Sequence, residues 1–357
     1  MTRRGEIAVY AGQGSSHSWT WLADLFEAKG VNDVRFLDAR EFVPHLGAGT
    51  DCAIVSGGDG FRIAESLSGN GFRTLRKFIE GGGMYVGICA GAYLPLPSKL
   101  GPFSEFNLSR TRIENIDQRI HDLSGVPTRV AVPYGSCSIV HPVRGEVVVE
   151  WDGKELLAPI YGGPIFKEPD EDQVLARYRG FTEKTEFQMS RVLAQNVVID
   201  KVASVKCSFG NGALILIGPH LEHPSYPDAN DLFLRTLDVN GRVEVPRGGV
   251  VDYLALDKAV ADLKVAIVGL ENRSFVVGKK LWDGSRYLEL VRAIENRTWT
   301  MGVDLAEEIA TSLWRVREDL KAMKVGVETD ADASTELLVE STRACVDNHF
   351  QALARGR

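Results

Sequence analysis

GGGMYVGICAGAY, residues 81–93, places a cysteine between two glycines directly after a strand-length apolar run. Residues 84–88 form the run, Cys89 follows it, and Gly87 and Gly91 frame the cysteine. This small-x-nucleophile-x-small pattern is typical of a nucleophile elbow, in which a strand turns sharply into a helix. A lone cysteine after a buried strand is more often a small core residue. The two glycines nevertheless favour a nucleophile, whose thiolate the following helix N-terminus would stabilise.

Strands and helical patterns alternate on the N-terminal side of this stretch. Further stretches that are typical of strands occur at residues 7–11, 34–37 and 52–55. This alternation predicts a parallel sheet with right-handed crossovers, and ligands bind beyond the carboxyl ends of such strands. The loops that leave those ends are residues 12–16, 56–60 and 89–93. We therefore expect these loops to border the ligand site.

The pattern changes beyond residue 128 into short strands separated by turn residues, which predicts antiparallel pairing. Gly210-Asn211-Gly212 is a strong hairpin signal between two such strands. Pro159 restricts its strand to an edge of the sheet, because proline cannot donate a ladder hydrogen bond. Residues 197–199 are expected to form another strand of the series.

A linker and a helical region are expected to complete the chain. Residues 242–249 contain a proline and glycines, which is typical of a linker. Apolar residues after it recur at helical spacing, as from Leu305 to Met323. We therefore divide the chain into a domain of residues 1–245 and an all-helical C-terminal region of residues 246–357. That region should pack on the first domain, on a second copy of the chain in a homo-oligomer, or on both, because it has few means of burying its apolar faces alone.

Composition and charge restrict the classes of function. The 357 residues are 44% hydrophobic and 25% charged, which is ordinary for a globular protein. The net charge is -7 and the basic residues are scattered, so we expect no nucleic-acid binding. No apolar run reaches the roughly 18 residues of a membrane span, and the N-terminus lacks the apolar region of a signal peptide. We expect a cytoplasmic protein without a membrane partner.

The cysteines and glycines also argue against bound metals and cofactors. The five cysteines, at positions 52, 89, 137, 207 and 345, are widely spaced and include no Cys-x-x-Cys motif. This argues against a disulfide framework or a zinc site and favours a reducing cytoplasm. Gly12-Gln13-Gly14 lacks the third glycine of a dinucleotide fingerprint, and His220 and His223 lack a third metal ligand. We therefore expect neither a cofactor nor a metal.

A histidine and a glutamate are the candidate partners of Cys89. His220-x-Glu222 lies just beyond a predicted strand end, as the cysteine does. A thiol nucleophile needs a base that takes its proton and returns it to the leaving group, and the base needs an acidic partner. Two residues apart on an extended segment, His220 and Glu222 point the same way. The alternative is that both belong to a solvated loop.

A tetrahedral intermediate at Cys89 would also need N–H donors for its oxyanion. The N–H of Ala90, the residue after the nucleophile, is one candidate. The N–H of Gly57 or Gly58, in the loop of a neighbouring strand, is the second. The alternative for these two glycines is a tight strand-to-helix turn without a chemical role.

Other polar and aromatic residues fit structural roles at least as well. His17 begins a predicted helix near the carboxyl edge of the sheet, where it either lines the pocket or lies at the surface. Trp21 is expected to be a packing residue rather than part of a ligand box. Cys137 has no elbow pattern around it and is expected to be structural.

Several of these motifs together resemble the class I glutamine amidotransferase superfamily. The motifs are Gly-Gly-Asp-Gly at residues 57–60, the elbow at residues 87–93 and Gly-Pro-His-x-Glu at residues 218–222. The branch that is most similar is the N-terminal domain of eukaryotic-type biotin–protein ligases, whose central motif resembles Tyr161-Gly162-Gly163-Pro164. The resemblance covers roughly residues 6–240. It implies a flavodoxin-like, mostly parallel sheet with flanking helices.

The resemblance also implies roles for the site residues. Cys89, His220 and Glu222 would form a catalytic triad. Oxyanion and substrate contacts would come from Gly57, Gly58, Ala90, Tyr161, Gly162 and Gly163. The chain has no adenylate loop of a biotin ligase and no synthetase domain that would receive ammonia, so biotinylation is not implied and any ammonia acceptor would be a partner enzyme chain.

These observations favour an amidase or amidotransferase-like enzyme that acts on a small amide or related acyl substrate through a Cys89 thioester. The alternative is a non-catalytic ligand-binding, scaffold or regulatory protein that keeps the fold and the pocket. The distance between the Cys89 thiol and the His220 imidazole, and the backbone strain at the elbow, discriminate between the two.

Overall fold

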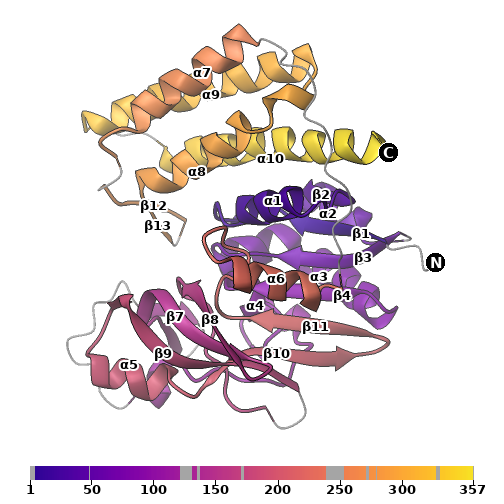
Figure 1. Ribbon diagram of the computed structural model, residues 1–357, viewed down its shortest axis with the longest axis vertical. Helices are drawn as coiled ribbons and strands as arrows, with labels where there is room; N and C mark the ends of the chain where they lie inside the picture. Colours follow the sequence, from indigo (N-terminus) through magenta and orange to yellow (C-terminus); the bar gives the residue numbers. More distant parts are fainter. Residues whose placement is uncertain are drawn as a thin grey trace.

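The computed structural model describes residues 5–47, 49–120, 131–134, 137–169, 173–238, 253–270, 273–278, 280–326 and 330–356. The predicted linker at residues 242–249 and the predicted domain boundary at residue 245 lie outside these ranges. Figure 1 shows a central sheet, with antiparallel strands on one side of it and the C-terminal helices on the other.

The sheet contains nine strands in the order β2-β1-β3-β4-β11-β10-β9-β7-β8. In chain order the strands are β1 (Glu6–Tyr10), β2 (Val34–Leu37), β3 (Thr50–Val55), β4 (Met84–Ile88), β7 (Val143–Trp151), β8 (Lys154–Ile160), β9 (Gln173–Phe187), β10 (Val202–Phe209) and β11 (Gly212–Ile217). The first four neighbouring pairs are parallel and the other four are antiparallel. The expectation of a mostly parallel sheet is thus correct only for the half that ends at β11, because short turns join several strands of the other half.

Helices cover both faces of the parallel half. Alternate residues of β1 point to opposite sides, so Ile7 and Val9 belong to one core cluster and Ala8 and Tyr10 to another. The first cluster includes residues of α1 (Trp19–Ala28) and α6 (Pro227–Thr236). The second includes residues of α2 (Ala39–His45) and α3 (Gly60–Glu80). Both faces are therefore buried, as parallel sheets require.

The antiparallel half follows the turn chemistry of the sequence. Gly210 adopts φ +59° in the hairpin that joins β10 to β11, which confirms the predicted turn. β8, which contains Pro159, forms the edge of the sheet as expected. The short elements before and beside this half are α4 (Ala90–Tyr93), η1 (Phe103–Phe106), η2 (Asp117–Arg119), β5 (Ala131–Tyr134) and β6 (Cys137–Val140).

One predicted strand of this half is wrong. Val197 and Val198 belong to the helix α5 (Arg191–Val198), and only Ile199 is extended. The Ser190 side chain accepts a hydrogen bond from the Leu193 N–H and so caps the helix. A short apolar run cannot be assigned to strand or helix by its pattern alone, and the serine cap decides in favour of the helix.

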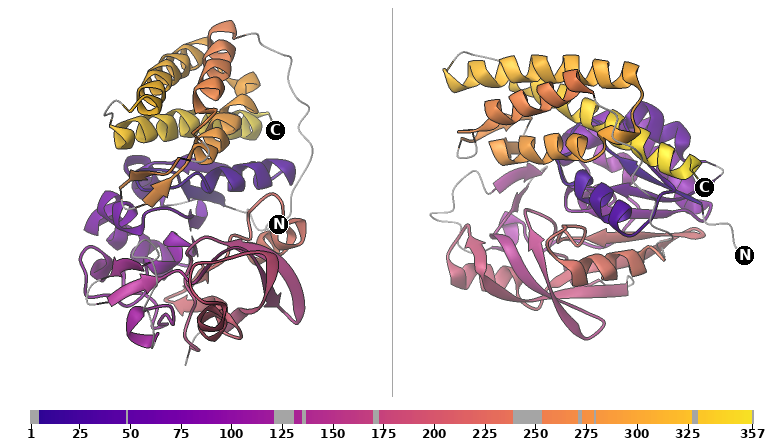
Figure 2. Two further views of the ribbon diagram at one scale, coloured as in Figure 1. Left: turned by 90° about the vertical axis from the view of Figure 1, so that its left-hand side faces the viewer. Right: turned by 45° about the horizontal axis from the view of Figure 1, so that its top comes forward.

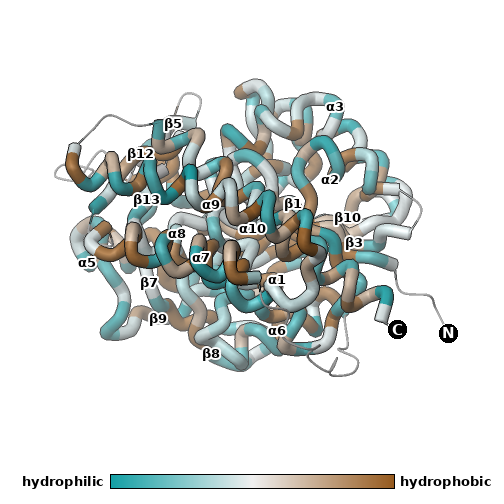
Figure 3. Tube along the Cα trace, turned by 90° about the horizontal axis from the view of Figure 1, so that it is seen from above, coloured by the Kyte–Doolittle hydropathy of each residue, from teal (hydrophilic) through white to brown (hydrophobic). Residues whose placement is uncertain are grey.

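The C-terminal region is mainly helical but contains a small hairpin. Its elements are α7 (Leu254–Ile267), β12 (Phe275–Val277), β13 (Lys280–Trp282), α8 (Gly284–Glu295), η4 (Thr298–Thr300), α9 (Val303–Lys324) and α10 (Ala331–Arg355). The two strands pair antiparallel, so the expectation of an all-helical region is wrong at this point. Figure 3 shows hydrophilic and hydrophobic positions mixed along α7, α8 and α9, as in helices that bury one face.

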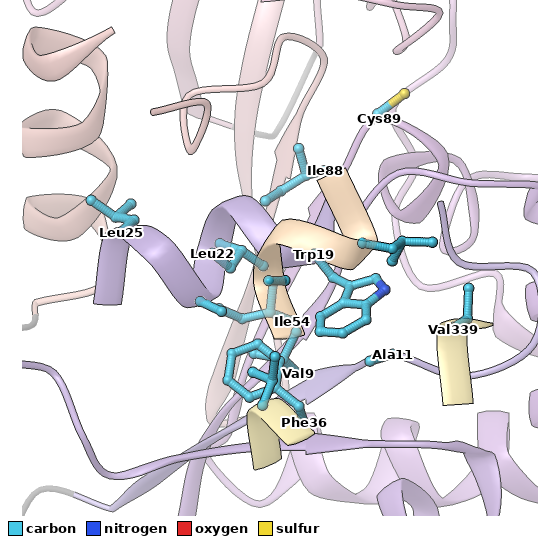
Figure 4. Packing of buried hydrophobic residues seen from close by; sticks show 14 of the residues in the cluster. Val9, Ala11, Trp19, Leu22, Leu25, Phe36, Ile54, Ile88, Cys89 and Val339 are labelled. Carbon is cyan, nitrogen blue, oxygen red and sulfur yellow. The ribbon is translucent and has the colours of Figure 1, made fainter. Parts of the chain in front are cut away.

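The C-terminal region packs directly on the first domain. α10 contacts β2 and α8 contacts α1, while α7 and α9 form the outer layer (Figures 1 and 2). Val339 of α10 belongs to the same apolar cluster as Val9 and Phe36 of the sheet (Figure 4). The expected packing on the first domain is therefore present. Within the described ranges, no helix combines the length and apolar character that a membrane span requires.

Polar contacts fix this packing. Arg35 of β2 makes two hydrogen bonds to the carboxylate of Asp347 in α10, at 2.9 and 3.0 Å. Arg297, which is 1% exposed, pairs with Asp24 at 2.7 Å and with Glu27 at 2.8 Å, both in α1. Bidentate and buried charge pairs demand a fixed geometry, so the C-terminal region is held in one position on the sheet.

Candidate active site

Cys89 occupies a sharp turn between β4 and α4. Its backbone angles are φ 52° and ψ −107°, a conformation that a residue with a side chain rarely adopts. A Cβ on Gly91 would overlap the carbonyl oxygen of Val55, and a Cβ on Gly87 would overlap the backbone of Gly91. The two glycines therefore permit the close approach of strand and helix that the elbow needs. The Cys89 sulfur points away from the apolar residues labelled beneath it (Figure 4).

His220 and Glu222 lie beside this thiol, in the segment that follows β11. Both are buried, at 2% and 0% exposure. The Nδ1 atom of His220 is 2.7 Å from Oε1 of Glu222, and a further hydrogen bond joins the ring to the Cys89 side chain. Ser56 donates to the same glutamate oxygen at 3.4 Å. The structure thus brings the three predicted residues together in the order thiol, imidazole, carboxylate.

The charge of His220 depends on its two partners. Burial alone lowers the pKa of an imidazole, but here the charges of Glu222 and Cys89, and hydrogen bonds to both, raise the pKa of His220 to about 10. The ring is therefore a cation at neutral pH. A cationic imidazole beside a thiol stabilises the thiolate, the nucleophilic form of cysteine.

The three predicted oxyanion donors have different surroundings. The Gly57 N–H donates to the hydroxyl of Ser18 at 3.2 Å, so it is already used. The N–H groups of Gly58 and Ala90 have no hydrogen-bond partner in the described part of the chain. Gly58 has φ +154°, and a Cβ there would overlap the carbonyl oxygen of Gly14. Gly58 and Ala90 are therefore the pair available to an oxyanion.

The predicted motif at residues 161–163 is only partly at the site. Tyr161 lies over the histidine, with its ring centroid 5.6 Å from that of His220. The Gly162 carbonyl accepts a hydrogen bond from the Tyr93 hydroxyl at 3.2 Å. Gly163 packs against the backbone of Gly218 and is not among the residues that line the cavities described below. Its position is structural, because any side chain would overlap that backbone.

Two cavities meet at the elbow. The larger, of about 790 Å³, is bordered by residues 12–16, Gly57, Gly58, Cys89 and Tyr161, as the strand-end argument predicts. The smaller, of about 40 Å³, is lined by residues that include Gly58, Ala90 and Gly162. Of the predicted loops, all three therefore reach the cavity over Cys89.

The C-terminal region forms the opposite wall of the larger cavity. The residues from this region include Trp282, Arg286, Glu336, Val339 and Arg343. Arg343 pairs with Glu41 at 2.7 Å and with Asp38 at 3.3 Å, which ties this wall to α2 and its N-cap. Sequence reasoning missed these residues. No motif marks them, and the resemblance ends before they begin.

Aromatic rings border the histidine of the site. Trp21 lies 5.4 Å from His220 and 4.4 Å from His223, measured between ring centroids. Burial and the positive charge of His220 lower the pKa of His223 to about 4, so this second imidazole is neutral at neutral pH. His17 also lines the cavity, and burial lowers its pKa well below the usual value. Trp21 is therefore part of the site as well as a packing residue.

Comparison with known proteins identifies one family, which matches the N-terminal part of the chain. Residues 6–119 match the family model described as "Biotin-protein ligase, N terminal", which confirms the resemblance to that branch over this part of the chain. No curated protein matches.

Among the described residues, no cluster of histidine, cysteine, aspartate or glutamate side chains could hold a metal ion.

Several solved structures are similar at low identity. A catalytic mutant of a GH42 beta-galactosidase from G. stearothermophilus is 13% identical with a TM-score of 0.41, and the match covers 68% of this chain but only 31% of that chain. A putative ThuA-like protein from Bacteroides uniformis is 14% identical with a TM-score of 0.39, covering 66% of this chain and 90% of that chain. A cytoplasmic protein from Salmonella typhimurium is 13% identical with a TM-score of 0.38, covering 67% of this chain and 100% of that chain. At these TM-scores the likenesses carry no argument about function.

Proposed function

We propose that this protein is a cysteine-dependent amidase or amidotransferase-like enzyme that acts on an amide or related acyl group through a thioester at Cys89. The observation that carries the proposal is the buried His220–Glu222 pair, 2.7 Å apart, hydrogen-bonded to a thiol on a strained elbow. Strained backbone at a reactive side chain is typical of functional sites and costs stability elsewhere. A protein that only binds ligands has no need of this arrangement.

The proposed reaction uses each group once in each half. The Cys89 thiolate attacks the amide carbonyl carbon and forms a C–S bond, while the Gly58 and Ala90 N–H groups hold the oxyanion. His220 gives its proton to the nitrogen as the C–N bond breaks, and the amine or ammonia leaves. Water then attacks the thioester, His220 accepts a proton from it, and the acid is released as the thiolate forms again. Glu222 keeps the ring oriented and stabilises its charge.

We also propose that the parallel half of the sheet is flavodoxin-like, which agrees with a site at Cys89. The parallel strands have the order β2-β1-β3-β4-β11, which is the 2-1-3-4-5 order of flavodoxin-like sheets. Cys89 follows the carboxyl end of β4, where such sheets bind their ligands. A cytoplasmic location is also part of the proposal, supported by five cysteines without disulfide bonds.

Assembly with other chains is a further part of the proposal. If the released nitrogen is ammonia and is transferred rather than lost to solvent, its acceptor is bound by a partner enzyme chain. A homo-oligomer through the C-terminal region is supported by exposed apolar side chains on its helices, such as Val265 at 69% and Val303 at 59%. Light scattering of the full chain measures the oligomeric state directly, and a monomer at all concentrations would contradict this part.

The test of the enzyme is release of ammonia or amine from a panel of small amides that includes glutamine. Wild type should turn over at least one of them, and Cys89→Ala should not. Cys137→Ala is the matched control, because Cys137 lies in β6 and lines neither cavity. Equal release by wild type and Cys89→Ala would refute the enzyme and favour the ligand-binding or scaffold alternative.

A further inference from the structure

Two arginines face the larger cavity from opposite parts of the chain. Arg144 lies in β7 of the sheet, and Arg286 lies in the first turn of α8 in the C-terminal region. Both line the cavity that contains Cys89. The two charges also act on one another, because Arg144 contributes to lowering the pKa of Arg286. Two guanidinium groups that converge on one cavity repel each other unless an anion lies between them.

Arg144 has no carboxylate partner in the described part of the chain. Its Nε atom is shielded from solvent and has no hydrogen-bond partner there. Glu186 stands opposite Arg144 in the β7–β9 ladder, but no ion pair joins the two side chains. A shielded N–H without an acceptor is costly, so this guanidinium fits an acceptor that enters from the cavity.

Arg286 has only a distant partner. Its side chain is 22% exposed, and its Nε atom is 3.9 Å from Oδ2 of Asp283. The other oxygen of Asp283 accepts from the Ser285 N–H at 3.1 Å and caps α8. The Arg286 guanidinium also lies over the Trp282 ring, 5.8 Å from its centroid. Burial lowers the pKa of Arg286, and the Asp283 charge opposes this only in part.

The next carboxylate along α8, that of Glu289, is already paired. Glu289 lines the cavity one turn further along α8, but it pairs with Arg292 at 3.5 Å. In the described part of the chain no carboxylate oxygen lies closer than 3.9 Å to the Arg286 nitrogens, so the guanidinium keeps donors for another acceptor. Guanidinium groups of this kind match the two oxygens of a carboxylate or phosphate through paired hydrogen bonds.

We propose that Arg144 and Arg286 together bind an anionic group, a carboxylate or a phosphate, on the substrate whose carbonyl reacts at Cys89. The proposal rests on the proposed function for the identity of the reacting group, but the anion site itself does not. A cavity of about 790 Å³ accommodates a substrate that reaches from the thiol to both arginines. The C-terminal region would then select substrates, because it supplies one of the two cations.

The test measures binding without turnover. Isothermal titration calorimetry on the full-length Cys89→Ala protein would compare succinate, inorganic phosphate and the neutral succinamide. We expect one of the two anions to bind and succinamide to bind at least about tenfold more weakly, since it offers no charge to the arginines. The tighter of succinate and phosphate identifies the class of anion. Equal binding of succinate and succinamide, without binding of phosphate, would overturn the proposal, as would the absence of binding by both anions.

Substitutions of the two arginines in the Cys89→Ala protein test whether they bind the anion. Arg144→Gln and Arg286→Gln should each weaken anion binding about tenfold or more, and Arg286→Lys should keep part of it because the charge remains. Arg315→Gln is the matched control, because Arg315 is an exposed arginine of α9 that lines neither cavity, and it should bind as the parent does. Binding unchanged in both glutamine variants would overturn the proposal, and Arg286→Lys decides if a glutamine variant does not fold.

This design separates the two proposals. Anion binding that depends on the arginines, in a protein whose wild type releases no amine from any amide, would sustain the anion site and refute the enzyme. Turnover that depends on Cys89 but not on either arginine would do the reverse.

Discussion

Two regions meet at the larger cavity: the corner formed by Cys89, His220 and Glu222, and the opposite wall with Trp282 and Arg286. They differ in how far their polar side chains already have hydrogen-bond or ion-pair partners. In the corner hydrogen bonds join the thiol, the imidazole and one oxygen of the glutamate, and the histidine and glutamate are almost completely buried. On the wall the guanidinium is part-exposed and has one carboxylate 3.9 Å away. Buried side chains that hydrogen-bond to one another are held in place, whereas a part-exposed guanidinium with spare donors can bind a group that enters the cavity. The comparison suggests that the corner carries out the reaction and that the wall selects the substrate through its anionic group.

Removing the nucleophile should produce the largest effect. Cys89→Ala should lower amide turnover at least about 10³-fold, because no other group in the corner can form the thioester. The midpoint of thermal unfolding should stay within about 2 °C of wild type, since the alanine keeps the Cβ and the backbone of the elbow. A turnover loss below about tenfold would show that Cys89 is not the nucleophile.

The contact between the first domain and the C-terminal region should contribute to the free energy of unfolding. Arg297→Met removes a buried guanidinium from Asp24 and Glu27 in α1 and should lower the free energy of unfolding by about 2 kcal/mol. Arg292→Met removes an exposed pair and should cost about 0.5 kcal/mol or less. Urea unfolding of both variants measures the difference. Equal losses would show that this contact does not hold the C-terminal region to α1.

The charge of the corner can be tested by titration. The Cys89 charge and hydrogen bond help to raise the pKa of His220 to about 10, against the lowering effect of burial. In Cys89→Ala these contributions vanish, so the pKa of His220 should fall by about one pH unit or more, which corresponds to about 1.4 kcal/mol. NMR titration of the imidazole in both proteins measures it. An unchanged value would mean that the thiol and the ring do not interact.

A smaller effect is expected at His223, at the edge of the corner. Burial and the His220 charge lower its folded-state pKa from 6.5 to about 4. The unfolded chain then binds the extra proton first, so stability is complete above about pH 6.5 and falls as the pH drops toward 4. His223→Gln should flatten the dependence of unfolding free energy on pH in this window. The same slope in wild type and variant would contradict the lowered pKa.

Most of the corner could be predicted from sequence because its residues follow strand ends. A strand end, two glycines and an alternating His-x-Glu fix position through backbone geometry alone, so Cys89, His220 and Glu222 could be named in advance. Gly57 could not be separated from Gly58, because only the fold shows that Ser18 already accepts the Gly57 N–H. The misassigned residues 197–199 depend on a serine cap that a short apolar run does not reveal.

The wall could not be predicted, for a different reason. Arg286 reaches the cavity only because α8 and α10 dock on α1 and β2, which are more than two hundred residues away in sequence. Contacts between distant segments leave no local pattern. The hairpin β12–β13, which ends at Trp282, consists of two three-residue strands and was hidden within a helical pattern.

The most direct test of the central claim is the reactivity of the thiol in the corner. With limiting iodoacetamide near neutral pH, mass spectrometry should find Cys89 alkylated first among the five cysteines, because the His220 cation stabilises its thiolate. Burial and the charge of Asp117 raise the pKa of Cys137, so this half-buried thiol should react slowly. His220→Ala should slow the labelling of Cys89 at least about tenfold. Equal labelling of Cys89 and Cys137, or a rate that does not depend on His220, would contradict an activated nucleophile.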